Sequence, residues 1–471
     1  MVKDNHPNNQ HQVPEMRRMK HIHFVGIGGA GMCGIAEVLK NQGYSISGSD
    51  VRASVVTKRL ESLGVTVFVG HQASNIDGAD ALVVSTAINH ENPEVSAAVE
   101  QRIPIVQRAE MLAELMRFRH GMAIAGTHGK TTVSSMVAHL LKQSKVDCSA
   151  FLGGILNNYN SNLLLSKQSK YTVVEADEYD RSFHWLTPHI AIITSADPDH
   201  LDIYGTEKAY RESFEKFTSL IRTGGHLIVK KGAKLTPQID DIDDIKIWEY
   251  SENEGDCYAE NIEIGNGEAV FDYVSPKGKI KNISLGVPVK INIENSVAAI
   301  AAAEICGVTD DEIRNAMKSF SGIKRRFEFH IKTPQIVFID DYAHHPNELT
   351  AAIESIKALY PENKITAVFQ PHLFTRTRDF AHEFGASLSL LDDIILLDVY
   401  PAREDPIEGV SSQLIFENID ASKKVLIKRD ELIDLLVDKQ LEVLVTFGAG
   451  DIDRLIPEIE SLLRDKYLTN I

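Results

Sequence analysis

The chain has 471 residues, of which 43% are hydrophobic and 24% charged, and this balance is typical of a globular protein with several domains. Its formal net charge of -17 argues against broad binding of nucleic acid, because a polyanion would be repelled outside local basic patches. No run of roughly 18 apolar residues predicts a membrane span, and the polar first 20 residues lack the apolar core of a signal peptide.

Cysteine usage indicates a reducing compartment. The four cysteines, Cys33, Cys148, Cys257 and Cys306, lie far apart in the sequence and form no Cys-x-x-Cys pair that would suggest a zinc site. We therefore expect a cytoplasmic protein, and we interpret residues 1–20 as a disordered tail.

The first expected strand, residues 21–25, leads directly into a glycine-rich turn, Gly26-Ile-Gly28-Gly29-Ala30-Gly31. A helical pattern follows, and a second strand ends at Asp50, about twenty residues past the glycines. This G-x-G-x-x-G pattern predicts a pyrophosphate at a helix N-terminus, with a sugar hydroxyl near Asp50. Taken alone it favours NAD, although another nucleotide diphosphate would fit the pattern equally well.

A second glycine loop follows the apolar strand at residues 122–125. It reads Gly126-Thr127-His128-Gly129-Lys130-Thr131-Thr132 and opens onto a helix. Glycine N–H groups and the lysine suit ATP phosphates, and the Thr131 hydroxyl suits Mg²⁺. The usual phosphate loop has glycine at the position of Ile124, so this loop is a shortened version.

Two further buried strands end in polar residues. The first, at 171–176, runs into Glu175, and the second, at 189–194, is followed by Asp199-His200-Leu-Asp202. An acid on a neighbouring strand commonly helps to hold Mg²⁺ in phosphate-loop enzymes, so we expect Glu175 to bind the metal. His200 is a candidate metal ligand or phosphate contact, and zinc is not expected, because no other His or Cys stands at zinc spacing.

Later segments predict more of the same architecture. Residues 245–285 read as short antiparallel strands, and the last part, from 324, reads as another α/β domain. Polar clusters stand at the expected ends of its strands, where ligands bind in such sheets. The candidates there for clamping an anion or moving a proton are Arg326, His344, His345, Arg376 and Arg378.

Motifs along nearly the whole chain beyond the tail resemble those of the Mur ligases, in the same order. The runs that carry the resemblance are Gly26-Ile-Gly-Gly-Ala-Gly-Met32, Gly34-Ile-Ala-Glu37, Ser85-Thr-Ala-Ile88, Asn92-Pro-Glu94, Gly126-Thr-His-Gly-Lys-Thr-Thr132, Glu175-Ala-Asp-Glu178, Asp199-His-Leu-Asp202, Arg325-Arg-Phe327, Asp341-Tyr-Ala-His-His-Pro346 and Gly448-Ala-Gly-Asp451. The resemblance implies an α/β fold of three domains: an N-terminal Rossmann-like domain at 21–117, a central P-loop-type ATPase domain at 118–323 and a C-terminal Rossmann-like domain at 324–471.

The resemblance also implies a reaction in peptidoglycan synthesis. ATP would phosphorylate the carboxylate of UDP-N-acetylmuramate, and the amine of L-alanine would attack the acyl phosphate. This order is chemically sensible, because a carboxylate is a poor electrophile until it carries a leaving group, and Lys130 with Mg²⁺ would screen the transferred charge. We expect no nucleic-acid or membrane partner, and a monomer or homodimer.

Residue roles follow from the same resemblance. The first domain would hold UDP in place of NAD, and Glu175 and His200 would be Mg²⁺ ligands. Asn295, near the end of the central domain, would contact adenine. In the third domain, Arg326 would contact the phosphates and His345 would contact the reaction intermediate. The remaining substrate contacts would be His71, Ser85, Thr86 and Arg108 at the sugar nucleotide, and Arg376 and Arg378 at the amino-acid carboxylate.

Three departures from the family pattern limit this transfer. The chain reads Val289-Lys-Ile-Asn-Ile-Glu-Asn295 where the family usually has Gly-x-His-Asn, so a histidine contact to adenine is missing. Glu215 falls near the place of a carbamylated lysine in related ligases, and we do not predict the modification. Pro401-Ala-Arg-Glu404 replaces Ala-Ala-Gly-Glu, which affects the contacts expected near Tyr400.

Three alternatives remain at this stage. A recycling ligase of the same family would add a preformed tripeptide to the same nucleotide. An NAD-dependent dehydrogenase would explain the first glycine loop, but it would leave Lys130, Glu175 and the third domain without a role. A nucleotide-binding regulatory module would bind without turnover.

Overall fold

The computed structural model describes residues 19–117, 119–166, 168–239, 244–402, 404–421 and 423–468. The predicted tail therefore lies outside the described residues, except for Met19 and Lys20. The chain forms two compact units. The first contains the chain up to Ser134 with Val146–Gly153 and Asn162–Trp248, and the second contains Ser135–Lys145, Gly154–Ser161 and the chain from Glu249 onward.

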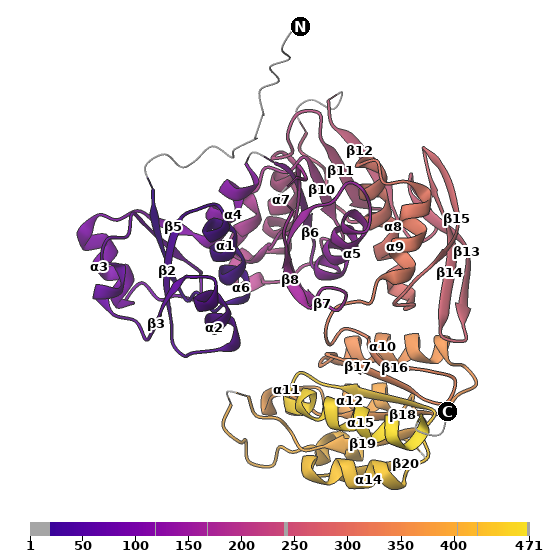
Figure 1. Ribbon diagram of the computed structural model, residues 1–471. Helices are drawn as coiled ribbons and strands as arrows, with labels where there is room; N and C mark the ends of the chain where they lie inside the picture. The colour runs from indigo at the N-terminus through magenta and orange to yellow at the C-terminus, as the bar shows by residue number, and fades with distance from the viewer. Residues whose placement is uncertain are drawn as a thin grey trace, which may run out of the picture. The chain divides into compact units, whose positions relative to one another are not determined.

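The first unit begins with a five-stranded parallel sheet in the order β3-β2-β1-β4-β5. Figure 1 labels β2, β3 and β5 of this sheet. Its strands are β1 (His21–Val25), β2 (Ser45–Asp50), β3 (Thr66–Val69), β4 (Ala81–Val84) and β5 (Ile105–Gln107). The strand order reverses between β1 and β4, and the crevice at such a reversal is where α/β sheets bind ligands. The loop that carries Gly28 follows β1 and therefore stands at this crevice.

Helices cover both faces of this sheet, because each face is apolar. The helices are α1 (Ala30–Asn41), α2 (Val55–Ser62), α3 (Pro93–Gln101) and α4 (Arg108–Met116), with a short 3-10 turn at Ala73–Ile76. Ile22, Phe24 and Val83 pack with buried residues of α1, α2 and α4. Val25 and Leu82 pack instead with residues of α3 and the 3-10 turn, so the sheet is buried from both sides as its apolar strands require.

A second sheet, most of which belongs to this unit, has seven strands in the order β12-β11-β10-β6-β9-β7-β8. Its strands are β6 (His120–Ala125), β7 (Ser149–Leu156), β8 (Ser161–Leu164), β9 (Tyr171–Glu175), β10 (Ile190–Ile193), β11 (His226–Lys230) and β12 (Lys246–Tyr250). The central strand β6 runs parallel to both neighbours, β9 and β10. The carboxyl ends of these three strands therefore meet at one edge, which brings together the segments that follow them.

The helices of this part are α6 (Leu201–Tyr204) and α7 (Glu207–Thr218), with a 3-10 segment at Tyr179–Trp185. Helix α5 (Lys130–Lys142) begins in the first unit and belongs to the second from Ser135 onward. Phe214 and Phe217 of α7 pack with Phe183 of that segment in one buried aromatic group. The first strand within residues 245–285, β12, joins the seven-stranded sheet beside β11. Its alternating sequence fits any half-exposed edge strand, so the pattern alone does not indicate which sheet it joins.

The second unit contains a three-stranded antiparallel sheet formed by β13 (Tyr258–Gly265), β14 (Glu268–Ser275) and β15 (Gly278–Ser284), which confirms the predicted antiparallel strands here. Helices α8 (Lys290–Ile305) and α9 (Asp310–Ser319) follow it. The alanine-rich α8 is buried on almost every side, from Val297 to Ala303, and its composition is accordingly apolar all round.

The unit ends in a six-stranded sheet in the order β16-β17-β21-β18-β19-β20. Its strands are β16 (Glu328–Lys332), β17 (Val337–Asp341), β18 (Ile365–Phe369), β19 (Asp393–Leu397), β20 (Lys423–Ile427) and β21 (Val443–Phe447), and only the edge strand β16 is antiparallel to its neighbour within this sheet as described. The α/β pattern predicted from residue 324 onward is therefore confirmed.

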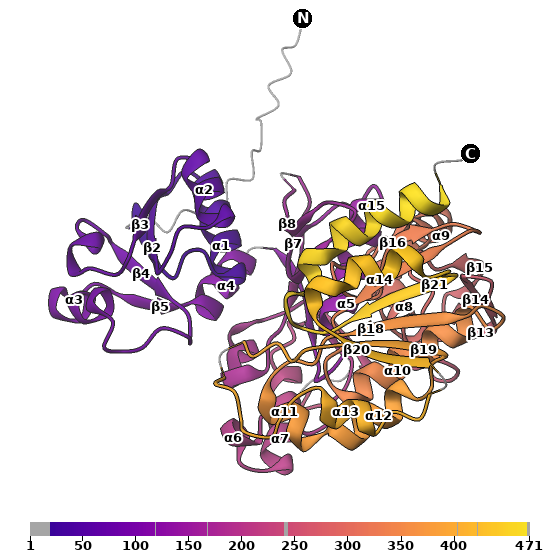
Figure 2. The same cartoon turned by 90° about the horizontal axis from the view of Figure 1, so that it is seen from below.

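Helices lie on both faces of the six-stranded sheet (Figure 2). One face carries α14 (Leu432–Asp438) and α15 (Ile456–Tyr467), whose leucines and isoleucines form a buried core with β17, β18 and β19. The other face carries α10 (Pro346–Leu359), α12 (Ala381–Leu388) and α13 (Gln413–Glu417), and the short α11 (Phe374–Asp379) precedes α12. The predicted α/β class is thus confirmed in both units. Within the described residues, no helix is both long and apolar enough to cross a membrane.

Candidate active site

The loop between β6 and α5 has the backbone of a phosphate-binding loop. Gly126 and Gly129 adopt φ angles of 138° and 85°, which favour glycine. A Cβ atom on Gly126 would lie 2.1 Å from Oγ1 of Thr194, so no larger residue fits against the end of β10. Lys130 starts α5, and the first N–H groups of that helix have no intrahelical acceptors and are available to an anion.

Two predicted ATP contacts hold this loop in place. The hydroxyl of Thr127 donates to the carbonyl of Asp197 at 2.6 Å, and the backbone N–H of His128 donates to the hydroxyl of Ser195 at 2.9 Å. Both acceptors follow β10, so the shortened loop is fixed to the neighbouring strand. These contacts to residues after β10, as well as the glycines, therefore fix the backbone conformation of this loop.

The ammonium group of Lys130 has two partners within the protein. Its ammonium group donates to the carbonyl of Gly126 at 2.7 Å and forms an ion pair of 2.7 Å with Glu178. The Glu178 side chain is only 1% exposed, and its charge in such a place requires a partner. Glu178 is one of several acids in the motif Glu175-Ala-Asp-Glu178, and its pairing with Lys130 was not predicted from the sequence.

Thr131 and Glu175 meet as the sequence predicts for a Mg²⁺ site. The Thr131 hydroxyl donates to the Glu175 carboxylate at 3.2 Å, and the N–H of Gly153 donates to the same carboxylate at 3.1 Å. Two adjacent ligands of an octahedral Mg²⁺ ion lie about 3 Å apart, so this oxygen pair fits the ion. Burial raises the pKa of Glu175, and its neighbours Thr131, Lys130 and Gly153 offset this only in part, so a bound cation would stabilise the carboxylate.

His200 is placed at the N-terminus of α6 with φ 50°, in the left-handed region. Its Nε2 lies 3.7 Å from Asp199 and its ring meets the edge of Tyr179 at 5.3 Å between centroids. His200 is thus paired with Asp199 and not with the Thr131–Glu175 pair. The side chain of Asp202 lies outside the described part of the chain. The assignment of His200 as a metal ligand stays a prediction.

The glycine turn after β1 lies against two predicted substrate-binding residues, Asp50 and Arg108. The N–H of Gly28 donates to the Asp50 carboxylate at 2.9 Å. A Cβ on Gly28 would lie 2.8 Å from that carboxylate, and a Cβ on Gly31 would lie 2.7 Å from the Arg108 guanidinium. Glycine at these positions therefore lets Asp50 and Arg108 approach the start of α1. Gly29 caps that helix, and the side chain of Ala30 lies outside the description.

A buried network missed at the sequence level surrounds His71. Glu94 is fully buried and accepts hydrogen bonds from Ser49 at 2.6 Å and Asn75 at 2.5 Å, and His71 Nδ1 lies 3.1 Å from it. Burial raises the pKa of Glu94, but the nearby His23 ring, 3.8 Å away, and hydrogen bonds from Ser49 and Asn75 outweigh this effect and bring the pKa to about 2. Glu94 lies in the motif Asn92-Pro-Glu94, which was the available signal for it. Ser85 and Thr86 follow β4, on the other side of the crevice from β2.

One cavity of about 140 Å³ in the first unit joins the two predicted ligand sites. From the nucleotide side it is lined by Gly31 and Arg108, and from the phosphate-loop side by Gly153, Glu175 and Asp177. Arg108 lies 3.8 Å from Asp177 across it. A ligand held at the first glycine turn therefore has a path to the predicted metal site.

The remaining candidates lie in the second unit. Asn295 of α8 is 8% exposed, and its side-chain amide donates to the Asn292 side chain at 3.1 Å. A contact with adenine through this amide group would require the pair to separate. Arg325 is bound to Asp340 at 3.1 Å and to the carbonyl of Gly448 at 2.6 Å, whereas Arg326 is exposed. The assignment of Arg326 as a phosphate ligand stays a prediction.

The second histidine of the predicted pair, His345, precedes α10 and packs its ring edge against Phe380 at 5.0 Å between centroids. Arg376 reaches the carbonyl of His344 at 3.5 Å, so it stands beside this pair. Arg378 instead pairs with its exposed neighbour Asp379 at 2.7 Å. The structure thus brings Arg376, and not Arg378, to the histidines. Arg403 of the unusual Pro401–Glu404 run lies outside the described residues.

A phosphate loop with a paired hydroxyl and carboxylate, next to a second nucleotide-type glycine turn, is the arrangement of an ATP-using enzyme with a nucleotide-bearing co-substrate. Family models described as the Mur ligase family catalytic domain, middle domain and glutamate ligase domain match residues 21–120, 124–303 and 325–450. The chain belongs to the Mur ligase family. It is therefore an ATP-dependent amide-forming ligase, as the sequence predicts, and members of the family generally use Mg²⁺.

Named relatives cover almost the whole chain. A UDP-N-acetylmuramate–L-alanine ligase of Phocaeicola vulgatus is 51% identical over 96% of this chain and 100% of its own length. One from Porphyromonas gingivalis is 47% identical over 95% and 99%. The crystal structure of the UDP-N-acetylmuramate-alanine ligase MurC of Thermotoga maritima matches with a TM-score of 0.77 and 28% identity over 94% of this chain and 99% of that one.

A murein peptide ligase of Psychrobacter arcticus, with a TM-score of 0.61 and 23% identity over 94% of this chain and 98% of that one, shares the fold. The predicted three-part α/β architecture is confirmed by these matches. They also exclude the dehydrogenase alternative, because the whole chain follows the ligase family.

Proposed function

We propose that the protein joins L-alanine to the carboxylate of UDP-N-acetylmuramate, with conversion of ATP to ADP and phosphate, in the cytoplasmic synthesis of peptidoglycan. The observation that carries this proposal is the cavity shared by Gly31, Arg108 and Glu175, because it joins a nucleotide-type turn to the metal site that we propose at the phosphate loop. The names of relatives about half identical to this chain support the choice of L-alanine.

We assign three ranges to three ligands: residues 21–117 to the UDP substrate, 118–323 to ATP and 324–471 to the amino acid. Each range contains a parallel or mixed sheet of its own, which supports the division. In the first range, Gly28 to Gly31 would receive the diphosphate. His71, Ser85, Thr86 and Arg108 would bind the rest of the sugar nucleotide, with Arg108 holding the carboxylate through its two-pronged donors.

In the central range, Lys130 would move from Glu178 to the transferred phosphate and neutralise its charge. Thr131 and Glu175 would hold Mg²⁺, with His200 as a further ligand, and the ion would screen the phosphate oxygens. The N-terminus of α5 would add N–H donors to the same anion. Asn295 would contact adenine after releasing Asn292, and Arg326, which is exposed, is available to the phosphates.

In the last range, Arg376 and Arg378 would bind the carboxylate of L-alanine, and His345 would contact the tetrahedral intermediate. The amine must lose a proton as it attacks the acyl phosphate, and the new amide forms as phosphate leaves. We propose a monomer or homodimer and no nucleic-acid partner. The net charge of -17 supports the second statement.

Phosphate release tests this function. Purified protein receives ATP, Mg²⁺ and UDP-N-acetylmuramate, and phosphate is measured with no amino acid, with L-alanine, and with the tripeptide that a recycling ligase would use. Release that depends on L-alanine supports the proposal. Release that needs no amino acid, or that responds only to the tripeptide, contradicts it.

A further inference from the structure

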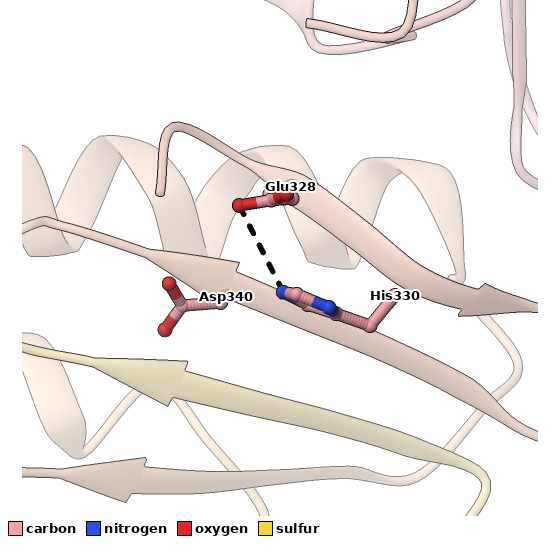
Figure 3. Close-up of side chains that lie close together, drawn as sticks. All are labelled: Glu328, His330 and Asp340. Carbon is pink, nitrogen blue, oxygen red and sulfur yellow. Dashed lines mark ion pairs between the residues drawn. The ribbon is translucent and has the colours of Figure 1, made fainter. Parts of the chain in front are cut away.

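Three side chains that the proposed reaction does not use lie together at the edge of the six-stranded sheet. Glu328 and His330 come from β16 and Asp340 from β17 (Figure 3). One ligand atom from each lies within 4.8 Å of the others. The cluster therefore combines one imidazole and two carboxylates within reach of a single ion.

Strand geometry explains the arrangement. Glu328 stands directly opposite Asp340 in the antiparallel pair, and the register of β16 against β17 shifts between Phe329 and Ile331, so His330 is the unpaired residue at a β-bulge. A bulge re-aims the side chain it carries, and here the ring of His330 lies beside Glu328. Like charges directly opposite each other destabilise a sheet. A positive charge between these two carboxylates would remove this cost.

His330 is oriented as a metal ligand usually is. Its Nδ1 lies 3.4 Å from the Glu460 carboxylate, and Arg464 holds Glu460 with hydrogen bonds of 2.9 and 2.7 Å. Its Nε2 lies 3.8 Å from Glu328 and is buried, without a hydrogen-bond partner among the described residues. A carboxylate on one ring nitrogen of a histidine commonly fixes the other nitrogen toward a metal.

The charges in this region leave room for a cation. Three carboxylates, Glu328, Asp340 and Glu460, face two guanidinium groups, Arg325 and Arg464. Asp340 also accepts from Thr446 at 2.7 Å, and Glu328 accepts from the N–H of Arg325 at 2.7 Å. Each carboxylate oxygen has two lone pairs, so these contacts do not use all acceptor positions.

We propose that Glu328, His330 and Asp340 bind a divalent transition-metal ion of the zinc, cobalt or manganese type. One imidazole with two carboxylates suits these ions better than Ca²⁺, which prefers oxygen ligands alone. Two ligands of a tetrahedral Zn²⁺ ion lie about 3.4 Å apart, close to the 3.8 Å between Glu328 and His330. The ion would link β16 and β17 to α15 through Glu460, and it is separate from the Mg²⁺ of the phosphate loop.

Titration with Co²⁺ tests the site, because its visible absorption reports ligand type and number. All samples carry Glu175→Gln to remove the proposed Mg²⁺ site, and His6→Gln with His11→Gln to remove other histidines from the N-terminal segment. Binding to cysteine is recognised by its thiolate charge-transfer band. The parent is compared with His330→Gln and with His382→Gln, an exposed histidine of α12 that serves as the matched control.

We expect one equivalent of Co²⁺ with nitrogen and oxygen ligation, a higher melting temperature with metal, and affinity reduced at least about tenfold in His330→Gln only. If His330→Gln does not fold, Glu328→Gln replaces it, since glutamine still accepts the Arg325 N–H, and the same loss is expected. No saturable binding, or equal binding in the parent and the cluster variants, would overturn the proposal.

Discussion

The ammonium group of Lys130 lies 2.7 Å from the carboxylate of Glu178, whose side chain is 1% exposed. Before ATP binds, the phosphate-loop lysine therefore neutralises a buried acid. In the proposed reaction the same positive charge would serve Glu178 in one state and a phosphate group in the other. This double use makes separate predictions for stability and for turnover.

Lys130→Ala should abolish turnover and also destabilise the protein, because it leaves Glu178 buried without its charge partner. Removing one member of a buried ion pair costs about 3–5 kcal/mol. Adding Glu178→Gln to Lys130→Ala should recover much of this stability without restoring turnover. Urea unfolding and phosphate release measure the two effects.

Binding of UDP-N-acetylmuramate should survive in the Lys130→Ala, Glu178→Gln double variant, because the proposed sugar-nucleotide site uses other residues. Calorimetric titration checks this point. A double variant as unstable as Lys130→Ala alone would show that the ion pair does not stabilise the fold, and loss of nucleotide binding would contradict the separation of the two sites.

Glu94 and His71 make the second prediction. Glu94 is ionised well below neutral pH, with a pKa of about 2, and it fixes Nδ1 of His71, which leaves Nε2 for a ligand. Glu94→Gln should raise KM for UDP-N-acetylmuramate about tenfold, the loss expected for one charged hydrogen bond. We expect kcat and KM for ATP to change much less.

Glu91→Gln is the control for that experiment, since Glu91 is an exposed acid three residues earlier. Equal KM values in Glu94→Gln and Glu91→Gln would exclude a positioning role for Glu94. A fall in kcat alone would point to a different function for this network.

Gly153 makes a sterically defined prediction about the metal site. A Cβ at this position would lie 2.3 Å from Oε2 of Glu175, so Gly153→Ala must displace the carboxylate. We expect the Mg²⁺ concentration for half-maximal activity to rise about tenfold, which corresponds to about 1.4 kcal/mol. Activity measured across a Mg²⁺ series checks this shift.

Gly34→Ala is a matched control, because Gly34 lines the same cavity but a Cβ there would meet Leu163 and Phe151 at an ordinary 3.6 Å. The two variants differ in their effect on Glu175 while adding the same methyl group. If both shift the Mg²⁺ requirement equally, Glu175 is not the group affected.

The loops and strands could be predicted from the sequence better than the contacts between side chains. The glycine turn at Gly28 and the loop at Gly126 follow strands in the structure as predicted, since apolar runs bounded by glycines define both. Partners distant in sequence were not predictable in this way. Glu178 was one of several acids after a strand, and its pairing with Lys130 depends on the packing of a 3-10 segment that carries no strong pattern.

The same limit explains the arginines and His71. Arg325 and Arg326 are adjacent and chemically equal in the sequence, but the left-handed φ of 62° at Arg325 helps to direct it to Asp340, while Arg326 is exposed. Glu94 approaches His71 across 23 residues because α3 packs on the sheet. Periodicity predicts the helix but not which of its acids is buried.

His139 provides a prediction for pH. It is 1% exposed on α5, and its ring nitrogens lie 3.0 Å from the hydroxyls of Ser319 and Tyr159. Burial lowers its pKa to about 4, so the folded protein holds this ring neutral over a range where the unfolded chain protonates it, starting below about 6.5.

The unfolded state therefore binds more protons between pH 6.5 and 4, and stability falls as the pH falls through this window. The contribution of the neutral ring to the free energy of unfolding is fully present above pH 6.5. By pH 4 the free energy of unfolding is lower by up to about 3 kcal/mol because of this residue. His139→Gln, which keeps polar contacts but does not titrate, should lose less stability than the parent over this range. Urea unfolding at several pH values measures the difference in slope, with the exposed His382→Gln as control. Parallel pH profiles for the parent and His139→Gln would mean that His139 is already protonated in the folded protein or is not desolvated there.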